Sequence, residues 1–288
     1  MDVFEIDFWK KTWMAFRNES ILQITQRRHS DRWKTFYDET SGIWAEMSGD
    51  AVSLARQITN HLTDHTTIAP GKTALDIGCG PGALSLCLAE RGIRVTALDY
   101  SRPMLKALEN TCRSRGVSIS TCLTDWAQFH TTERYDLVIA SCFPDVMCPD
   151  GIERMETLSN DCCAVVIGWG KEAFPIRERL WNALMKTALP KTAAHMTCMI
   201  NYLMTLGRFP NLVHLQVPVE THIALETIQN YFIRYFAIFE IPENTVRQAF
   251  HNVPSEWFKN GWFHAKGVFH FALIWWKPHG YLGESKSP

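Results

Sequence analysis

The sequence predicts an α/β protein built on a mostly parallel central sheet. Short apolar segments alternate with amphipathic segments between residues 72 and 170, as strands and helices do in such sheets. Two of the apolar segments, 136–140 and 162–167, carry almost no polar residues, which is typical of strands buried on both faces. A glycine-rich turn joins the first expected strand to the first expected helix. The alternation implies parallel strands with right-handed crossovers.

The first 70 residues predict a helical arm that precedes this sheet. Phe8, Trp9, Trp13 and Phe16 recur at helical spacing, and more aromatic residues follow before an expected break at Ser41-Gly42. A further helix is expected over residues 50–62, and Pro70-Gly71 forms a closing turn. We therefore expect an N-terminal arm, or lid, over residues 1–70 and a second domain over residues 71–288.

The elements of the second domain follow from local patterns. Gly92 and Gly116 stand where helix C-cap glycines belong, and Ser101 stands where an N-cap belongs, with Pro103 in the first turn. The expected strands are 73–77, 94–98, 117–123, 136–140, 162–167, 212–217 and 267–276. The expected helices are 83–91, 101–116, 176–189, 193–206, 225–239 and 245–250. We expect a helical insertion at about 171–210.

Composition narrows the class of partner. The chain has 288 residues with a formal net charge of −1, whereas proteins that bind phosphate backbones usually carry a strong positive excess. Nine cysteines with no basic leader at residues 1–8 favour reduced thiols in the cytoplasm. The longest apolar stretch, 268–276, is far shorter than the roughly 20 residues of a spanning helix. We expect a small-molecule substrate, and neither a nucleic acid nor a membrane as partner.

The motif that carries chemistry runs from Asp76 to Gly82. A glycine-rich turn before a helix lets backbone N–H groups approach a ligand at the positive end of the helix dipole. No Gly-Lys-Ser/Thr follows, so the turn is not a P-loop. The dinucleotide fingerprint allows alanine at its last position, which Ala83 occupies here, so the glycine spacing alone does not exclude a nicotinamide cofactor. Asp76 would repel a pyrophosphate and would suit a ligand with a cationic end.

Two further acidic residues end neighbouring strands. Asp99 lies 21 residues after Gly78, where a carboxylate can accept hydrogen bonds from ribose hydroxyls. Asp125-Trp126 follows the next strand, and a carboxylate beside an aromatic ring could read an adenine amino group and stack on its face. Open α/β sheets bind ligands at this edge.

Together these segments resemble the motifs of class I S-adenosylmethionine-dependent methyltransferases, over roughly residues 72–170. The resemblance implies a Rossmann-like three-layer αβα sandwich with a seven-stranded sheet whose last strand is antiparallel, and S-adenosylmethionine as co-substrate. It places Asp76 near the methionine amino group, Asp99 on the ribose and Asp125 at the adenine. The cofactor contacts expected on this basis are Asp76, Gly78, Cys79, Gly80, Gly82, Asp99, Tyr100, Ser101, Met104, Asp125, Trp126 and Ser141. By analogy, Tyr37 and Trp44 could close over the cofactor from the arm.

Several interpretations stay open at this stage. The activity could instead be methylation of RNA or protein, or cofactor binding without catalysis. No catalytic base is identified: His195, His264 and His270 have no sequence-near partner. Segment 141–145 follows the fourth strand and is expected to form the floor of the active site. Cys142 in this segment and Cys148 just after it are interpreted as small buried thiols rather than as ligands for a soft metal or arsenic. No metal site is expected, and the oligomeric state is not predicted.

Overall fold

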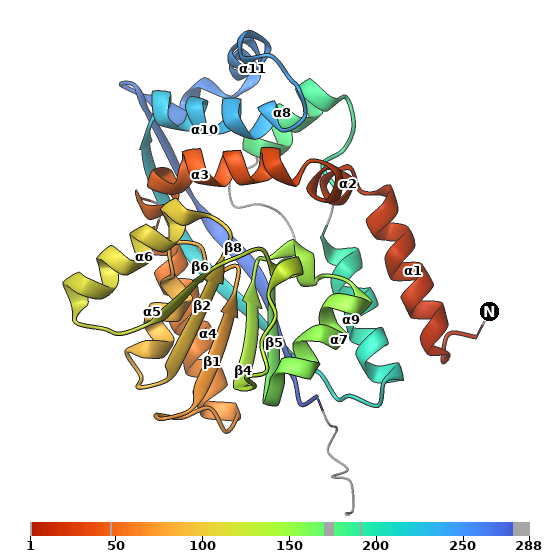
Figure 1. Ribbon diagram of the computed structural model, residues 1–288. Helices are drawn as coiled ribbons and strands as arrows, with labels where there is room; N and C mark the ends of the chain where they lie inside the picture. The colour runs from red at the N-terminus through yellow and green to blue at the C-terminus, as the bar shows by residue number, and fades with distance from the viewer. Residues whose placement is uncertain (1, 47, 170–175, 191, 279–288) are drawn as a thin grey trace, which may run out of the picture.

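The computed structural model describes residues 2–46, 48–169, 176–190 and 192–278. Its centre is one sheet in the order β3-β2-β1-β4-β5-β8-β6 (Figure 1). The strands of this path are β1 (Thr73–Ile77), β2 (Arg94–Asp99), β3 (Ser120–Leu123), β4 (Tyr135–Ser141), β5 (Ser159–Gly168), β6 (Asn211–Ala224) and β8 (Trp262–Trp276). The first five pair in parallel, and β8 runs antiparallel to both β5 and β6. The expected topology is confirmed, and the two-residue β7 (Phe258–Lys259) adds an eighth strand.

Helices cover both faces of the sheet. On one face lie α4 (Ser48–His65), α5 (Ala83–Ala89) and α6 (Arg102–Arg115), and on the other α1 (Ile6–Glu19), α7 (Pro149–Leu158) and α9 (Ala193–Thr205). Alternate residues of a strand enter different cores: Leu75 and Ile77 pack with α1, α7 and α9, whereas Ala74 packs with α4 and α5. This arrangement is the three-layer sandwich that the sequence predicts. Two 3₁₀ turns, η1 (Trp126–Gln128) and η2 (Pro144–Val146), follow β3 and β4.

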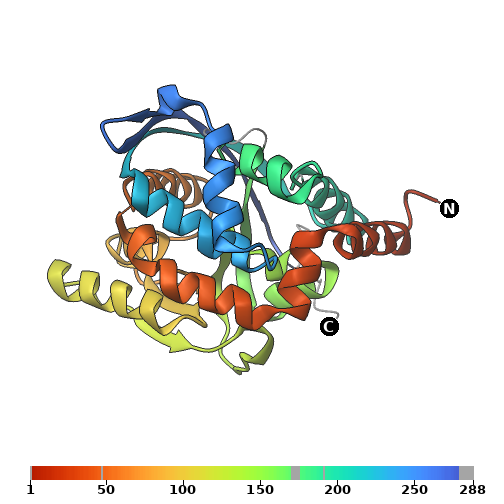
Figure 2. The ribbon, with the colours of Figure 1, turned by 90° about the horizontal axis from the view of Figure 1, so that it is seen from above.

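A helical cap lies above the carboxyl ends of the parallel strands (Figures 1 and 2). It contains α2 (Ile21–Arg28), α3 (Ser30–Glu46), α8 (Ile176–Met185), α10 (Leu225–Ala237) and α11 (Glu243–Ala249), followed by the 3₁₀ turns η3 (Phe250–Asn252) and η4 (Ser255–Trp257). The cap has its own aromatic core, in which Trp33, Phe36, Trp181, Tyr235 and Phe236 are buried. Three separate stretches of chain therefore build this cap.

The cap differs from the expected arm and insertion. Of the expected arm, α2 and α3 join the cap, whereas α4 packs on the sheet through Ile58 and Leu62. Of the expected insertion, α8 joins the cap, but α9 packs beside α1 through Met199 and Tyr202. Residues 225–261, to which the sequence assigned no role beyond helices, supply the rest of the cap. The division into an arm over residues 1–70 and a second domain over residues 71–288 stays a prediction.

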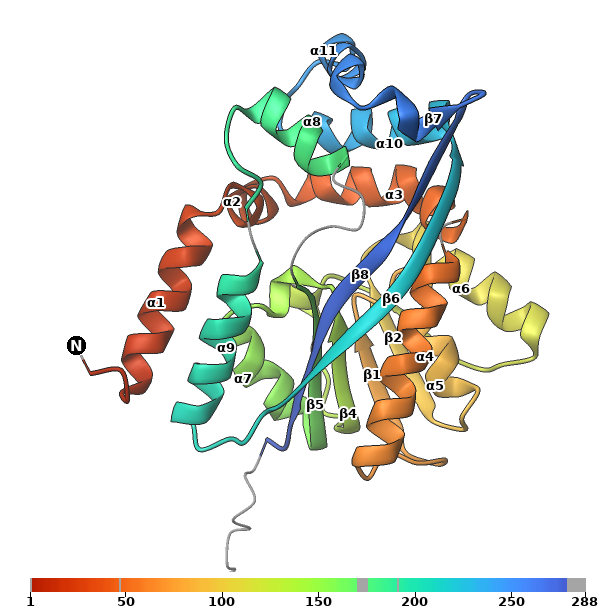
Figure 3. The same cartoon turned by 180° about the vertical axis from the view of Figure 1, so that it is seen from behind.

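Some expected boundaries were wrong for identifiable reasons. No break occurs at Ser41-Gly42, because α3 continues to Glu46 and packs its aromatic face against α10. A glycine inside a helix costs only about 1 kcal/mol relative to alanine, which such packing can offset. β6 and β8 are much longer than expected and pair with each other over 14 residues as a ribbon that rises to the cap (Figure 3). The outer part of β6 alternates buried and exposed residues, so no continuous apolar run marks it.

Candidate functional site

The glycine-rich turn lies at the carboxyl edge of the sheet, between β1 and α5. Gly78, Gly80 and Gly82 all have positive φ, at 68°, 55° and 85°, which non-glycine residues rarely adopt. A Cβ at Gly78 would stand 2.3 Å from Phe143 Cδ2, and one at Gly82 would stand 2.3 Å from Leu108 Cδ1. A Cβ at Gly80 would meet nothing within 4 Å. Packing therefore demands glycine at the two ends of the turn, while its middle faces open space.

Asp99, at the end of β2, ties this turn to the next loop. Its Oδ2 accepts a hydrogen bond from the backbone N of Gly80 at 2.9 Å, and its Oδ1 accepts one from the N of Ser101 at 2.8 Å. Burial raises the pKa of the carboxyl, although these two hydrogen bonds act in the opposite direction. Because each carboxylate oxygen has a second lone pair, Asp99 can still accept hydrogen bonds from two hydroxyl groups.

Asp76 lies beneath the turn rather than on its surface. Its side chain is 1% exposed, and Ser85 Oγ on α5 donates to its Oδ2 at 2.6 Å. Burial raises the pKa of this carboxyl to about 6, although the hydrogen bond from Ser85 acts in the opposite direction. The visible role of Asp76 is to hold β1 to α5; the expected contact with a methionine amino group stays a prediction.

The structure separates the expected roles of Asp125 and Trp126. Asp125 caps η1, where its Oδ1 accepts from the N of Ala127 at 2.8 Å. Trp126 is 4% exposed and packs in the core against Phe129, and the guanidinium of Arg154 lies 4.0 Å from its ring centroid. Arg154 and the core thus surround the ring in this structure, and the expected contact of Trp126 with an adenine stays a prediction. An adenine contact by Asp125 stays a prediction.

Tyr37 and Trp44 come from α3, which crosses the cap above this edge (Figure 1). The ring of Tyr37 lies 6.2 Å from that of Tyr100 and 6.4 Å from that of Trp44. Asp38 accepts a 2.5 Å hydrogen bond from Ser101 Oγ, which also caps α6. The arm thus contacts the loop after β2, and closure of Tyr37 and Trp44 over a cofactor stays a prediction.

The other expected contacts lie around the same edge. Ser141 ends β4 and is half-buried, Cys79 is half-buried within the turn, and Met104 is 3% exposed at the start of α6. Burial raises the pKa of the Cys79 thiol well above its usual value. The structure thus brings the twelve predicted residues to one edge of the sheet, and their contacts with a cofactor stay predictions.

The three histidines considered as bases lie elsewhere. His195, at the start of α9, is buried, and its Nδ1 accepts a hydrogen bond from Trp13 Nε1 at 3.0 Å. Burial, with the nearby Arg17, lowers the pKa of His195 to about 4. His264 and His270 lie on β8 in the ribbon, and each stacks on a histidine of β6. These contacts give each histidine a packing role.

One residue that the sequence did not single out, Arg17, contacts the loop after β4. Arg17 on α1 is 5% exposed, and its Nη1 donates to the carbonyl of Met147 at 2.6 Å and that of Pro144 at 3.4 Å. It therefore holds the loop after β4, which contains Asp145 in η2. Helical spacing on α1 could not reveal a partner 130 residues away.

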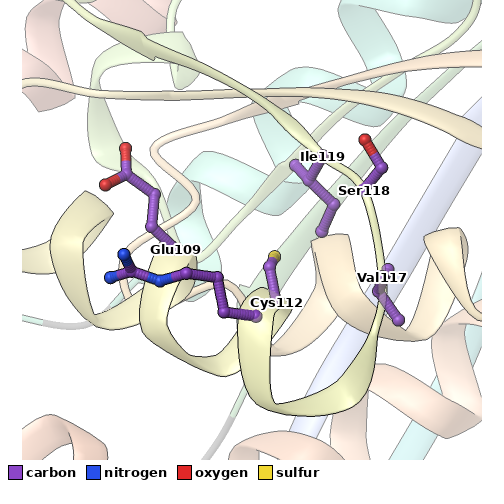
Figure 4. A pocket seen from close by; sticks show the side chains of 6 residues that line it. Glu109, Cys112, Val117, Ser118 and Ile119 are labelled. Atoms are coloured by element: carbon purple, nitrogen blue, oxygen red, sulfur yellow. The ribbon is translucent and has the colours of Figure 1, made fainter.

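Two surface depressions lie away from the carboxyl edge of the sheet. One, of about 320 Å³, is bounded by Glu109, Cys112 and Ile119 between α6 and the segment before β3 (Figure 4). Another, of about 210 Å³, lies between the end of α1 and the start of α9. Within the described ranges, no group of three His, Cys, Asp or Glu residues is placed to hold a metal ion. No described helix is long and apolar enough to cross a membrane.

Comparison with known proteins shows which family this part of the chain resembles. Residues 74–159 match a family described as "Methyltransferase domain". This segment of the chain is similar to a methyltransferase domain. That domain includes the glycine-rich turn, Asp99, Asp125 and Ser141.

Curated relatives match about a third of the chain. The chain is 38% identical over 81 residues to the cypemycin N-terminal methyltransferase of Streptomyces sp, covering 28% of this chain and 33% of that protein. It is 32% identical over 119 residues to the nocamycin O-methyltransferase of Saccharothrix syringae, covering 38% and 41%. The chain thus spans less than half the length of these relatives.

A solved structure shares the fold over most of the chain. The magnesium protoporphyrin IX methyltransferase of Synechocystis PCC 6803, solved with bound S-adenosylhomocysteine, superposes with a TM-score of 0.50 at 13% identity. The match covers 86% of this chain and 92% of that one. It confirms the Rossmann-like fold of the methyltransferase domain.

Proposed function

We propose that this protein transfers the methyl group of S-adenosylmethionine to a small-molecule acceptor. The observation that carries the proposal is the join between the glycine-rich turn and the loop after β2, made by the Asp99 carboxylate. Gly80 in that turn faces open space, so the backbone can approach a ligand closely. A turn built only for stability would have no need of this open side.

The residues present fit the methyl donor. Asp99 retains acceptor capacity for two ribose hydroxyls, and Asp125 stands at the end of the next strand for the adenine amino group. When bound, the donor supplies a methyl group that is already electrophilic. The protein then needs to hold an acceptor in line with that methyl group in a dry site. The helical cap over the strand ends supports the exclusion of water (Figure 2).

A small acceptor is favoured by charge and by architecture. A net charge of −1 offers no general attraction to a nucleic acid, and a helical cap lies over the strand ends. The curated relatives match only 28% and 38% of the chain, so they do not name the acceptor. We include a cytoplasmic location in the proposal because nine cysteines suit a reducing compartment.

The decisive experiment is calorimetric titration with S-adenosylhomocysteine, with NAD titrated in parallel. We expect binding of S-adenosylhomocysteine, a loss of at least tenfold in affinity for Asp99→Ala, and no signal with NAD. Asp64→Ala, which removes an exposed carboxylate on α4, is the matched control and should bind as the wild type does. Absence of S-adenosylhomocysteine binding, or clear binding of NAD, would overturn the proposal.

A further inference from the structure

The depression between the end of α1 and the start of α9 has the size and the walls of a small-ligand site. The two helices lie side by side (Figures 1 and 3), and the depression between their ends has a volume of about 210 Å³. Pockets that take drug-sized ligands measure roughly 300–1,000 Å³, so this one suits a smaller molecule. Phe16 and Pro190 form apolar walls, whereas Glu19 and His195 bring polar groups.

His195 offers this depression an N–H group that no protein atom uses within the described ranges. The side chain is 7% exposed, and its Nδ1 accepts a hydrogen bond from Trp13 Nε1 at 3.0 Å. Because an indole N–H can only donate, Nδ1 carries no proton, and the proton of the neutral ring lies on Nε2. No described residue accepts a hydrogen bond from that Nε2. A buried N–H group without an acceptor points to a ligand that supplies one.

The start of α9 adds backbone N–H groups beside this ring. Thr192 stands at the N-cap but does not cap the helix, because its Oγ1 donates to the carbonyl of Gly168 at 2.7 Å. The N of His195 bonds to the carbonyl of Thr192, whereas the N of Ala193 and that of Ala194 meet no acceptor among the described residues. Ala194 also lines the depression. Unpaired N–H groups at the positive end of a helix dipole favour an anionic oxygen.

Glu19 gives the opposite wall the opposite charge. It is the last residue of α1, its side chain is exposed, and within the described ranges no Lys, Arg or His forms an ion pair with it. The carbonyl end of α1 carries a partial negative charge, which favours a cation in the same place. A small molecule with a carboxylate at one end and an ammonium group at the other therefore matches both walls.

We propose that this depression binds a small amino carboxylate, with its carboxylate on His195 Nε2 and the N–H of Ala194 and its ammonium group toward Glu19. The depression lies away from the carboxyl edge of the sheet, so this site does not depend on the proposed methyl transfer. Its ligand is an effector rather than a substrate. Arg17, two residues before Glu19 on α1, holds the loop after β4, so this helix joins the depression to that loop.

The test compares three probes of similar size. L-Alanine carries both charges, propionate lacks the ammonium group, and ethylammonium lacks the carboxylate. NMR spectra of isotope-labelled protein follow the ring of His195 and the amide of Ala194 during each titration. We expect L-alanine to shift both signals and to bind roughly two- to fivefold more tightly than propionate, as an exposed ion pair allows. Ethylammonium should shift neither signal.

Variants separate the two walls of the depression. Glu19→Gln, a surface change, should remove the preference for L-alanine over propionate. His195→Leu should weaken both ligands by about tenfold or more, as loss of a hydrogen bond to a charged group does. His195→Gln keeps an acceptor for Trp13 and an N–H donor, so it should retain most of the affinity. Asp7→Asn removes an exposed carboxylate at the other end of α1 and should change neither affinity.

A repeat of the L-alanine titration with saturating S-adenosylhomocysteine excludes the cofactor edge. S-adenosylhomocysteine has an amino carboxylate of its own, so it would displace L-alanine from that edge and leave binding in the depression unchanged. Displacement would overturn the inference. So would unshifted His195 and Ala194 signals, equal affinity for L-alanine and propionate in the wild type, or full affinity in His195→Leu. If S-adenosylhomocysteine itself does not bind, the proposed function fails, while the L-alanine signals still decide this site.

Discussion

Replacing Gly78 by alanine tests the geometry of the glycine-rich turn directly. The new Cβ would stand 2.3 Å from Phe143 Cδ2 and 2.7 Å from its Cγ, at a backbone φ of 68°. A left-handed conformation costs an alanine roughly 1–2 kcal/mol. Forcing a methyl group into a packed contact costs roughly 1–3 kcal/mol more. We therefore expect Gly78→Ala to lower the free energy of unfolding by about 2–5 kcal/mol.

Two other glycines separate these contributions. Gly80, at φ 55°, and Gly116, at φ 66°, have no atom within 4 Å of an added Cβ. Alanine at either position carries only the backbone cost, about 1–2 kcal/mol. The smaller freedom of the unfolded chain offsets roughly 0.4–1 kcal/mol in all three variants, so it cancels from their differences. Gly78→Ala should therefore be less stable than Gly116→Ala by about 1–3 kcal/mol.

Urea unfolding followed by tryptophan fluorescence measures these differences. S-adenosylhomocysteine titration of the same variants should show weaker binding for Gly78→Ala and Gly80→Ala, and unchanged binding for Gly116→Ala at the far end of α6. Adding Phe143→Ala to Gly78→Ala should cost less than the two single changes together, because the clash is then removed. Equal stability of Gly78→Ala and Gly116→Ala would refute the close packing of Phe143 on the turn.

Three further predictions concern ionisable groups that are buried or half-buried. Asp76→Asn should raise the free energy of unfolding at pH 8 by about 2–3 kcal/mol, because the pKa of the carboxyl is about 6 in the folded protein and 3.8 in the unfolded chain. Urea unfolding should show that this gain vanishes between pH 6 and pH 4. A gain that does not depend on pH would contradict the prediction. For His195 the pKa shift has the opposite direction, to about 4 in the folded protein. The free energy of unfolding of the wild type should therefore fall by about 3 kcal/mol as the pH falls from 6.5 to 4. The same urea measurements on His195→Gln should lack this fall. Glu156→Gln should lower the free energy of unfolding in urea by about 1–3 kcal/mol, because Glu156 accepts two 3.0 Å hydrogen bonds from Arg208. The affinity for S-adenosylhomocysteine should stay unchanged. A loss of affinity would mean that the Glu156–Arg208 pair supports the site.

The local pattern of the sequence was sufficient for the sheet and for most of the cofactor edge. β1, β4 and the later part of β5 are apolar segments, and the ends of α6 are marked by Ser101 and Gly116. Because parallel strands place their carboxyl ends at one edge, Asp99 and Gly80 could be expected to meet before any contact was known. Motif spacing and strand order are local or topological features, which a sequence carries.

Tertiary contacts decided the rest. Trp126 turned into the core because Arg154 covers its ring, and α3 ran through Gly42 because its aromatic face packs on α10. Asp145 acquired its place through Arg17, which reaches the loop after β4 from a helix 130 residues earlier. A side chain's orientation depends on which distant surfaces bury it, and the free energy of that burial exceeds the local preferences that a sequence pattern records. The sequence alone determined where a cofactor-binding edge would form, and only the folded chain determined which side chains face it.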